Sequence, residues 1–383
     1  MLFFIGFVFL LFLVVGIHIA YPFILKRKSM EDMRLDITHD TTRKFSDATL
    51  PFVSVLIPVY NEELSIKQRI ENLFKSDYPK YQLEIIVVDS GSNDGTRSAI
   101  ETSFRDRVTL VTEEERKGKA HAINLGLEIA KGEIIILTDA TALYDEKTIL
   151  HLVTPFKDKT IGGVSALYEI PNSGESHPSG SERTFWSHKD NIRILESKVH
   201  STSWLSGEAC AFRNKIINRV SEDSLADDSN IALQIISEGY RSVVNQKSSF
   251  SERSPTQFSD YIKIKSRRTL GGLMETLRFK SLLFNRKYGT FGMLIFPYRF
   301  FTYVISPILS CLLLVLVIPC AIEIHKFVGT YTVLLAIITL IFMLFIGRKT
   351  VTAYFYTQLF TLIALVWLVS GKTDVRWSRS SSR

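Results

Sequence analysis

The chain has 383 residues, and its 46 Lys and Arg against 39 Asp and Glu give a formal net charge of +7. At ~150 residues per domain this length allows about two domains. The positive charge does not indicate a nucleic-acid partner, because the basic clusters at 26–28, 267–269 and 347–349 mostly adjoin apolar segments, where they serve as membrane orientation signals. Three cysteines, two of them in one apolar run, are too few to frame a disulfide-stabilised fold.

The first predicted element is a transmembrane helix over residues 1–25. This segment contains no Lys, Arg, Asp or Glu and is longer than the ~20 apolar residues that span a bilayer. A cleaved signal peptide is the alternative, but its positive residues would precede the apolar run, whereas Lys26, Arg27 and Lys28 follow it. We therefore predict an uncleaved anchor in the cell membrane, a linker over 26–50 and, by the positive-inside rule, a cytoplasmic domain after it.

The region 51–288 alternates between buried strands and helices. Continuous apolar runs predict strands over 51–61, 83–89, 108–113 and 133–139, and the segments between them predict helices over 62–79, 96–104 and 119–130. This alternation predicts an α/β fold with a mostly parallel sheet and right-handed crossovers.

Polar residues gather where the predicted strands end. Tyr60 and Glu62 lie at the carboxyl end of the first strand, Asp89 ends the second and Asp139 ends the fourth. One such acid alone is better explained as a helix N-cap. Ligands of open α/β sheets bind outside the carboxyl ends of the strands, so that three such ends at one edge predict a binding site.

Asp139 also suggests a metal site. The second position after it holds Thr141 instead of another carboxylate. A threonine hydroxyl is a weaker ligand, but Mg²⁺ commonly binds through one or two carboxylates together with substrate phosphates. The residues alone leave open whether this is a metal site with one ligand replaced, a different way of using the metal, or no metal site.

The C-terminal part is predominantly apolar. Its aromatic residues predict an interfacial helix over 289–302, and three apolar runs predict about three transmembrane helices over 303–371, followed by a basic tail over 372–383. Three spans would place this basic tail outside the cell, against the positive-inside rule, so the sequence leaves open whether one run is re-entrant.

Four segments in this order resemble the motifs of membrane-bound, inverting family 2 glycosyltransferases. They are "VSVLIPVYNEE", "IIVVDSGSNDGT", "RKGKAHAINLGLEIAKGEIIILTDA" and "ADDSNIALQIISEGYR", and the likeness runs from about residue 51 to 272. It extends to the catalytic core of cellulose and hyaluronan synthases. The resemblance implies a GT-A fold, a Rossmann-like α/β architecture, and a nucleotide-sugar donor whose base we expect to be uridine.

The resemblance also assigns roles to individual residues. Asp228 matches the catalytic base that takes the proton of the acceptor hydroxyl. Asp139 with Thr141 matches the metal motif, which implies that they hold Mg²⁺ or Mn²⁺, with a degenerate site in a non-catalytic protein as the alternative.

The resemblance also implies a set of binding residues. The nucleotide-binding positions are Pro58, Tyr60, Glu62, Asp89 and Lys119, with a solvated side chain as the alternative for Lys119. The pocket for donor sugar and acceptor is lined by Trp204, Ser206, Gly207 and Asp227, with a packing role as the alternative for the first three.

The last motif departs from the processive synthases. Those enzymes carry Gln-x-x-Arg-Trp, whereas this chain has "YIKIKSRRTLGG", with Arg267 and Arg268 but no following tryptophan. Arginine suits a diphosphate because its planar fork donates two hydrogen bonds. We expect one of these arginines to bind the leaving diphosphate, with a basic helix on the membrane surface as the alternative.

The sequence therefore predicts a membrane-bound inverting glycosyltransferase with a lipid-linked or growing glycan as acceptor. Transfer of one or a few sugars is favoured over long polymers, and membrane partner subunits would be needed for a wide translocation path. A non-catalytic, nucleotide-binding membrane scaffold is the alternative. A transporter is disfavoured, because the chain has few spans and no acid within them.

Overall fold

The computed structural model describes residues 2–31, 50–328 and 358–371. Within these ranges one eight-stranded sheet has the order β3-β2-β1-β4-β7-β6-β8-β5. The strands are β1 (Val53–Val59), β2 (Leu83–Asp89), β3 (Thr109–Thr112), β4 (Ile134–Leu137), β5 (Leu143–Tyr144), β6 (Ile161–Glu169), β7 (Cys210–Arg213) and β8 (Arg241–Ser251). The predicted α/β fold with a mostly parallel sheet is confirmed: the pairs within β3-β2-β1-β4 and the pair β6-β8 are parallel, and β7 runs antiparallel to both its neighbours.

Helices cover both faces of this sheet. One face packs against α2 (Ile66–Phe74), α3 (Thr96–Phe104) and α5 (Thr148–Val153), and the other against α4 (Lys119–Ile129) and α7 (Asp227–Ser237). Successive residues of β1 point to opposite faces, so that Val55 and Ile57 enter the first core and Leu56 the second. Each of the three helices predicted before residue 131 is present, which leaves the carboxyl ends of β1, β2 and β4 at one edge.

The first helix is longer than predicted. Helix α1 (Leu2–Glu31) continues past residue 25, so Lys26, Arg27 and Lys28 belong to the helix and not to a linker. These residue types are good helix formers, and Arg27 pairs with Glu31 one turn later at 3.2 Å. The remainder of the predicted linker, 32–49, lies outside the described residues.

The predicted interfacial helix is not a separate element. Residues 291–328 form one helical stretch made of η7 (Phe291–Ile295), α9 (Phe296–Phe300), η8 (Phe301–Ile305) and α10 (Ser306–Val328), in which η7 and η8 are π-helical turns. The aromatic segment thus leads into the first C-terminal apolar run without a break. A shorter apolar helix, Gln358–Val369, belongs to the third run, whereas the second run and the basic tail lie almost entirely outside the described residues.

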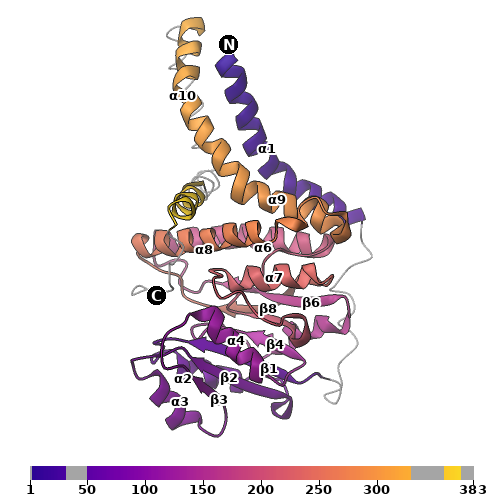
Figure 1. The fold of residues 1–383 in the computed structure, drawn as a ribbon, viewed down its shortest axis with the longest axis vertical. Coiled ribbons are helices and arrows are strands. Elements are labelled where there is room, and N and C mark those ends of the chain that lie inside the picture. The colour runs from indigo at the N-terminus through magenta and orange to yellow at the C-terminus, as the bar shows by residue number, and fades with distance from the viewer. Residues whose placement is uncertain (1, 32–49, 329–357, 372–383) are drawn as a thin grey trace.

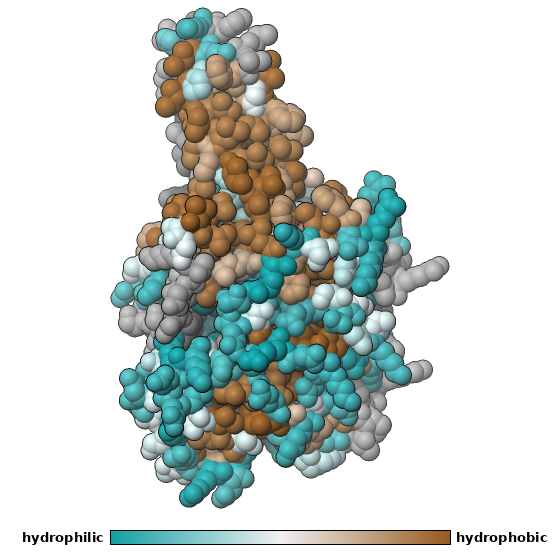
Figure 2. All heavy atoms as spheres, in the orientation of Figure 1, coloured by the Kyte–Doolittle hydropathy of each residue, from teal (hydrophilic) through white to brown (hydrophobic). Residues whose placement is uncertain are grey.

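The apolar helices form a stem on one side of the α/β domain (Figure 1). Helix α1 packs along α10, and two stretches, Phe3–Glu31 and Phe291–Glu323, are long and apolar enough to cross a membrane. Figure 2 shows a nearly continuous apolar surface over this stem and a mostly hydrophilic one over the domain. Side chains such as Phe12 (76% exposed) and Ile318 (69% exposed) make up that surface, which distinguishes the stem from the buried helices of a soluble core.

Candidate active site

A cavity of about 1490 Å³ begins at the carboxyl edge of the sheet and continues to the stem. Its sheet-side wall includes Pro58, Tyr60, Glu62, Lys119, Asp139, Thr141, Gly207, Glu208, Asp227 and Asp228. Helix α8 (Phe258–Arg278) adds Arg267 and Arg268, and the stem adds residues of α1, α9, η8 and the helix Gln358–Val369. The cavity thus connects the predicted donor site with the apolar part of the molecule.

Lys119 lies at the centre of the sheet-side wall. It opens α4, after Gly118, whose φ of +108° is a conformation that favours glycine. Its Nζ lies 2.7 Å from Asp139 Oδ1 and 3.4 Å from Asp227 Oδ2. Burial opposes the charged form of Lys119, but the two carboxylates outweigh it and raise its pKa above the ordinary value. Lys119 is therefore a permanent cation between the strand end and α7.

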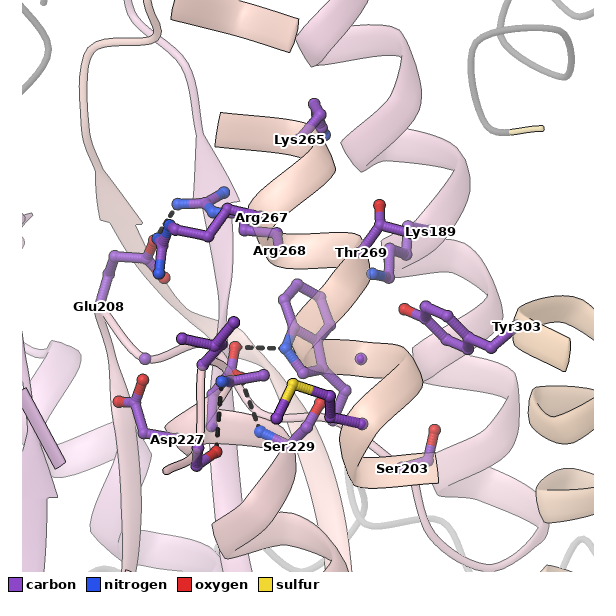
Figure 3. A pocket seen from close by; sticks show the side chains of 18 of the residues that line it. Lys189, Ser203, Glu208, Asp227, Ser229, Lys265, Arg267, Arg268, Thr269 and Tyr303 are labelled. Atoms are coloured by element: carbon purple, nitrogen blue, oxygen red, sulfur yellow. Dashed lines mark hydrogen bonds and ion pairs between the residues drawn. The ribbon is translucent and has the colours of Figure 1, made fainter. Parts of the chain in front are cut away.

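Asp227 and Asp228 occupy the first turn of α7. The residue that caps this helix is Ala226, which makes no side-chain capping bond, so capping does not explain either aspartate. Asp228 accepts hydrogen bonds from the Trp204 indole N–H and, at 2.6 Å, from the backbone N–H of Ser229 (Figure 3). Burial, followed by repulsion from Asp227, raises the pKa of Asp228 to about 6. This carboxylate is ionised at neutral pH and basic enough to accept a proton.

The second position of the metal motif contacts a residue that the sequence did not single out. The Thr141 hydroxyl donates to Glu252, which follows β8. Glu208 also lies near Asp139: burial raises its pKa to about 7, Arg268 opposes this shift, and Glu252 and Asp139 add to it. These groups are oxygen ligands of the kind that Mg²⁺ and Mn²⁺ prefer.

The described residues contain no group of three His, Cys, Asp or Glu placed to hold a metal ion by themselves. The protein would therefore supply part of a coordination shell through Asp139 and Thr141, and phosphate oxygens of a donor would have to supply the rest. Such a division suits Mg²⁺, which usually combines one or two carboxylates with substrate phosphates.

The two arginines of α8 project into the cavity opposite Glu208 (Figure 3). Arg268 Nη2 lies 2.9 Å from Glu208 Oε1, and 29% of the Arg268 side chain is exposed. A basic helix lying only on the membrane surface would not place a guanidinium within this cavity. Both guanidinium groups therefore line the cavity, and that of Arg268 is held there by Glu208.

The predicted nucleotide residues differ in their placement. Pro58, Tyr60 and Glu62 line the cavity, and the Arg116 guanidinium, which the sequence did not single out, lies 3.9 Å from the Tyr60 ring centroid. Asp89 does not line the cavity. It is fully buried, accepts from the backbone of Ser92 at 3.2 Å and pairs with Arg97 at 3.2 Å. In this structure Asp89 shapes the loop beside the cavity and does not face into it.

The predicted residues of the loop before β7 also differ in whether they line the cavity. Gly207 lines the cavity, where a side chain would approach Lys119 and Asp227. Ser206 does not line it: its backbone N–H donates to Ser165 Oγ at 2.8 Å, and only 1% of the residue is exposed. Trp204 lines the cavity with its indole stacked on that of Trp186, the ring centroids 4.8 Å apart.

Two cationic residues that line the cavity near Trp204 carry no local sequence signal. Lys189, on α6 (His177–Val199), has its Nζ 3.8 Å from the Trp204 ring centroid. Arg299, on α9, is 6% exposed and donates to Ser203 O at 3.0 Å, Thr276 Oγ1 at 2.9 Å and Gly272 O at 3.2 Å. Both come from segments far from the strand ends, and only the tertiary fold brings them to the cavity.

Comparison with known proteins agrees with this geometry. Residues 54–221 match the family described as Glycosyl transferase family 2. The chain is 25% identical over 79% of its length to the probable glycosyltransferase YdaM of Bacillus subtilis, of which 74% is covered. A second relative comes from Methanococcus voltae and is named dolichyl N-acetyl-alpha-D-glucosaminyl phosphate 3-beta-D-2,3-diacetamido-2,3-dideoxy-beta-D-glucuronosyltransferase. The two chains are 24% identical over 69% of this chain and 83% of the relative. Several other relatives match over less than half of their own length.

The fold has a counterpart among solved structures. The mannosyltransferase PcManGT from Pyrobaculum calidifontis, in complex with GDP-Man and Mn²⁺, superposes with a TM-score of 0.75 at 25% identity, covering 96% of this chain and 98% of PcManGT. The agreement includes the stem as well as the domain, since nearly the whole chain is covered. Residues 54–221 therefore match a family 2 glycosyltransferase domain, and the comparisons support a glycosyltransferase with a GT-A fold.

Proposed function

We propose that the chain transfers a sugar from a nucleotide-sugar donor to a lipid-linked acceptor, with inversion at the anomeric carbon. The observation that carries this proposal is the single cavity that joins the sheet edge to the apolar stem. A soluble acceptor would not need a cavity lined at one end by membrane-type helices. The name of the Methanococcus voltae relative includes a dolichyl phosphate, which supports a lipid-linked acceptor.

The donor would bind with its base near Tyr60 and Glu62 and its diphosphate between Lys119 and the arginines of α8. These cations would stabilise the charge that develops on the departing diphosphate. PcManGT is in complex with GDP-Man, so guanosine stands beside uridine as a candidate base. A Mg²⁺ or Mn²⁺ ion held by Asp139 and Thr141 would neutralise further negative charge on the diphosphate.

Asp228 would act as the general base. Its Oδ2 is oriented by the Trp204 indole, and its raised pKa of about 6 keeps it ionised yet reactive at neutral pH. As the acceptor oxygen forms its bond to the anomeric carbon, the proton of that hydroxyl moves to Asp228 and the bond to the nucleoside diphosphate breaks on the opposite side. The product is a glycoside of inverted configuration.

We place the enzyme in the cell membrane, with the stem in the bilayer and the catalytic domain (51–288) on the cytoplasmic side. The two long, exposed apolar helices support the membrane location, and the basic end of α1 supports the orientation.

Release of nucleoside diphosphate by the detergent-purified chain tests the proposal. The assay would compare UDP- and GDP-sugars in the presence of Mn²⁺, Mg²⁺ or EDTA, with a membrane lipid extract as the source of acceptor. We expect turnover with one donor, a loss of activity in EDTA, and a loss of about 10²–10⁴-fold in Asp228→Asn. Asp106→Asn, at an exposed position on the domain surface, is the matched control. Near-normal transfer by Asp228→Asn would rule out the assigned base.

A further inference from the structure

Lys189 lies in the part of the cavity between the base Asp228 and the stem. Its Nζ is 3.8 Å from the centroid of the Trp204 ring, and the indole N–H of the same ring donates to Asp228. One aromatic side chain thus separates a carboxylate from an ammonium. Lys189 lines the cavity together with Thr269 of α8 and Tyr303 of the stem, all three of which are labelled in Figure 3.

This ammonium has no acidic partner. Among the described residues no carboxylate lies within 4.0 Å of Lys189 Nζ, whose close contacts are with aromatic rings. The neighbouring lysine of α8 shows the contrast, because Lys265 Nζ pairs with Glu182 at 2.8 Å. Burial and Arg193 lower the pKa of Lys189 to about 8, as expected of a cation that lacks a compensating anion.

The surroundings of Lys189 carry an excess of positive charge. Arg193 pairs with Asp190 at 2.6 Å and is thereby neutralised. Arg299 donates only to hydroxyl and carbonyl oxygens and forms no ion pair with any described residue. The buried carboxylate of Glu196 lines the same cavity and feels the charge of Arg299, but it accepts from the Tyr21 hydroxyl at 2.8 Å and forms no ion pair with Lys189. Two buried or half-buried cations therefore lie on the acceptor side of Asp228 without direct contact to a carboxylate of the described residues.

Beyond these cations the part of the cavity wall that α1 contributes is mostly apolar, with His18 as its one polar residue. The wall there is formed by α1, through Val15, Ile19, Pro22 and Phe23, and by Tyr298 of the stem. From the sheet edge outward the order is therefore base, cation, apolar surface. A lipid that carries a hydroxyl-bearing glycan through a phosphate presents its groups in the same order.

Building on the proposed function, we infer that the acceptor lipid is joined to its glycan by a phosphate or diphosphate, and that Lys189 binds this phosphate beside Trp204. A neutral glycolipid such as a glycosyldiacylglycerol would leave the ammonium uncompensated. The lipid chain would lie along α1 and Tyr298, and the terminal hydroxyl of the glycan would reach Asp228.

Equilibrium binding to the full-length, detergent-purified chain tests this inference without any donor. Farnesyl phosphate and farnesol share one lipid chain and differ in the phosphate, and isothermal titration calorimetry would measure both. Because a hydrogen bond to a charged group contributes more than a neutral one, we expect farnesyl phosphate to bind on the order of tenfold more tightly or better. Lys189→Met should lose most of this preference, and Lys189→Arg should retain it.

Lys198→Met is the matched control, because Lys198 is exposed near the end of the same helix. Titration with GDP and UDP would show that each variant keeps its donor site, and Lys189→Gln provides a second neutral variant should Lys189→Met fail to fold. Equal affinity of the wild-type chain for farnesol and farnesyl phosphate would overturn the inference. A preference for farnesyl phosphate that survives in both neutral variants would also overturn the inference. Displacement of farnesyl phosphate by inorganic phosphate at equal concentration would overturn it too, because it would indicate a general anion site.

These results are independent of turnover. A chain that prefers farnesyl phosphate but releases no diphosphate from any nucleotide sugar would support the subsite and contradict the proposed function. A chain that transfers sugar but binds farnesol and farnesyl phosphate equally would support the proposed function and contradict the phosphate subsite.

Discussion

Lys119 and Asp139 form a 2.7 Å ion pair at the sheet edge, so the carboxylate proposed to hold a metal already has a cation against it. Lys119 also contacts Asp227, which ties the strand end to the helix that bears the base. A metal ion and Lys119 would thus compete for Asp139 until a diphosphate provides additional oxygen atoms. This competition makes metal affinity dependent on the donor.

Removal of the competing ammonium should strengthen metal binding in the absence of donor. We expect Lys119→Met to bind Mn²⁺ several-fold more tightly, because an ion pair near 3 Å in a partly buried site is worth about a kcal/mol or more. Electron paramagnetic resonance of free Mn²⁺ measures this directly. Lys131→Met, at an exposed position just after α4, is the control, and an unchanged affinity in Lys119→Met would argue against Asp139 as a ligand.

Activity should fall as the pH drops through the pKa of the base. Asp228 must be ionised to accept a proton, and its pKa of about 6 predicts an acidic limb near pH 6 in kcat/KM. In Asp227→Asn the repelling carboxylate is removed, so the pKa of Asp228 should fall and the limb should move to lower pH. A pH–rate profile of each enzyme checks this, and a limb that moves to higher pH would show that Asp227 acts in another way.

Removal of the Trp204 indole N–H should move the acidic limb to higher pH, opposite to the effect of Asp227→Asn. Its N–H donates to the carboxylate of Asp228 and thereby favours the ionised form. Trp204→Phe keeps an aromatic ring but removes this donor, so the pKa of Asp228 should rise and the limb should move to higher pH. Trp186→Phe is the control, because the Trp186 N–H donates to Glu182 and not to Asp228. Matching profiles for the two variants would contradict the assigned role.

We expect the planar guanidinium of Arg268, and not only its charge, to contribute to the affinity for the nucleoside diphosphate. Arg268→Lys retains the positive charge but loses the planar fork, and we expect about a tenfold weaker affinity for the nucleoside diphosphate. Calorimetric titration with the diphosphate measures the change. Arg278 on the same helix does not itself line the cavity, although its partner Asp223 does, and Arg278→Lys should bind as the wild-type chain does. Equal affinities in all three proteins would remove Arg268 from the donor site.

The packing of α4 on the sheet makes a separate prediction about stability. A side chain added at Gly126 would meet Leu56 Cδ1 at 2.0 Å. Although alanine favours helices, overpacking of this kind costs about 1–3 kcal/mol, so Gly126→Ala should lower the free energy of unfolding. Chemical denaturation followed by circular dichroism gives the difference. Glu128→Ala, at an exposed position of the same helix, should change stability by less than about 0.5 kcal/mol.

The part of the site that the sequence predicted best is the part that local patterns encode. Apolar runs ending in Glu62 and Asp139 predict where strands end, and parallel strands bring those ends to one edge. The lining position of Lys119 follows from its place at the start of α4. Asp89 has the same local pattern but turns inward to Arg97, which no local pattern reveals.

The residues that the sequence did not single out depend on contacts between distant segments. Glu252 becomes relevant only because β8 brings it to Thr141, and Glu208 because α8 brings Arg268 to it. Lys189 belongs to an amphipathic helix whose charges look like an ordinary solvated face. The length of α1 was underestimated for another reason, since hydropathy marks where the apolar residues end and not where the helix ends.

The contacts of Arg299 have a mechanical consequence. This residue belongs to the unbroken helical stretch 291–328, yet it donates to Ser203 on the loop that carries Trp204 and to Gly272 on the helix that carries Arg268. The stem therefore cannot tilt without moving two walls of the cavity. If the acceptor is anchored in the bilayer as proposed, we expect the reach from the anchor to Asp228 to be nearly constant. A glycan extended by one sugar would then present its terminal hydroxyl beyond Asp228, so we expect a single addition to each acceptor to be favoured.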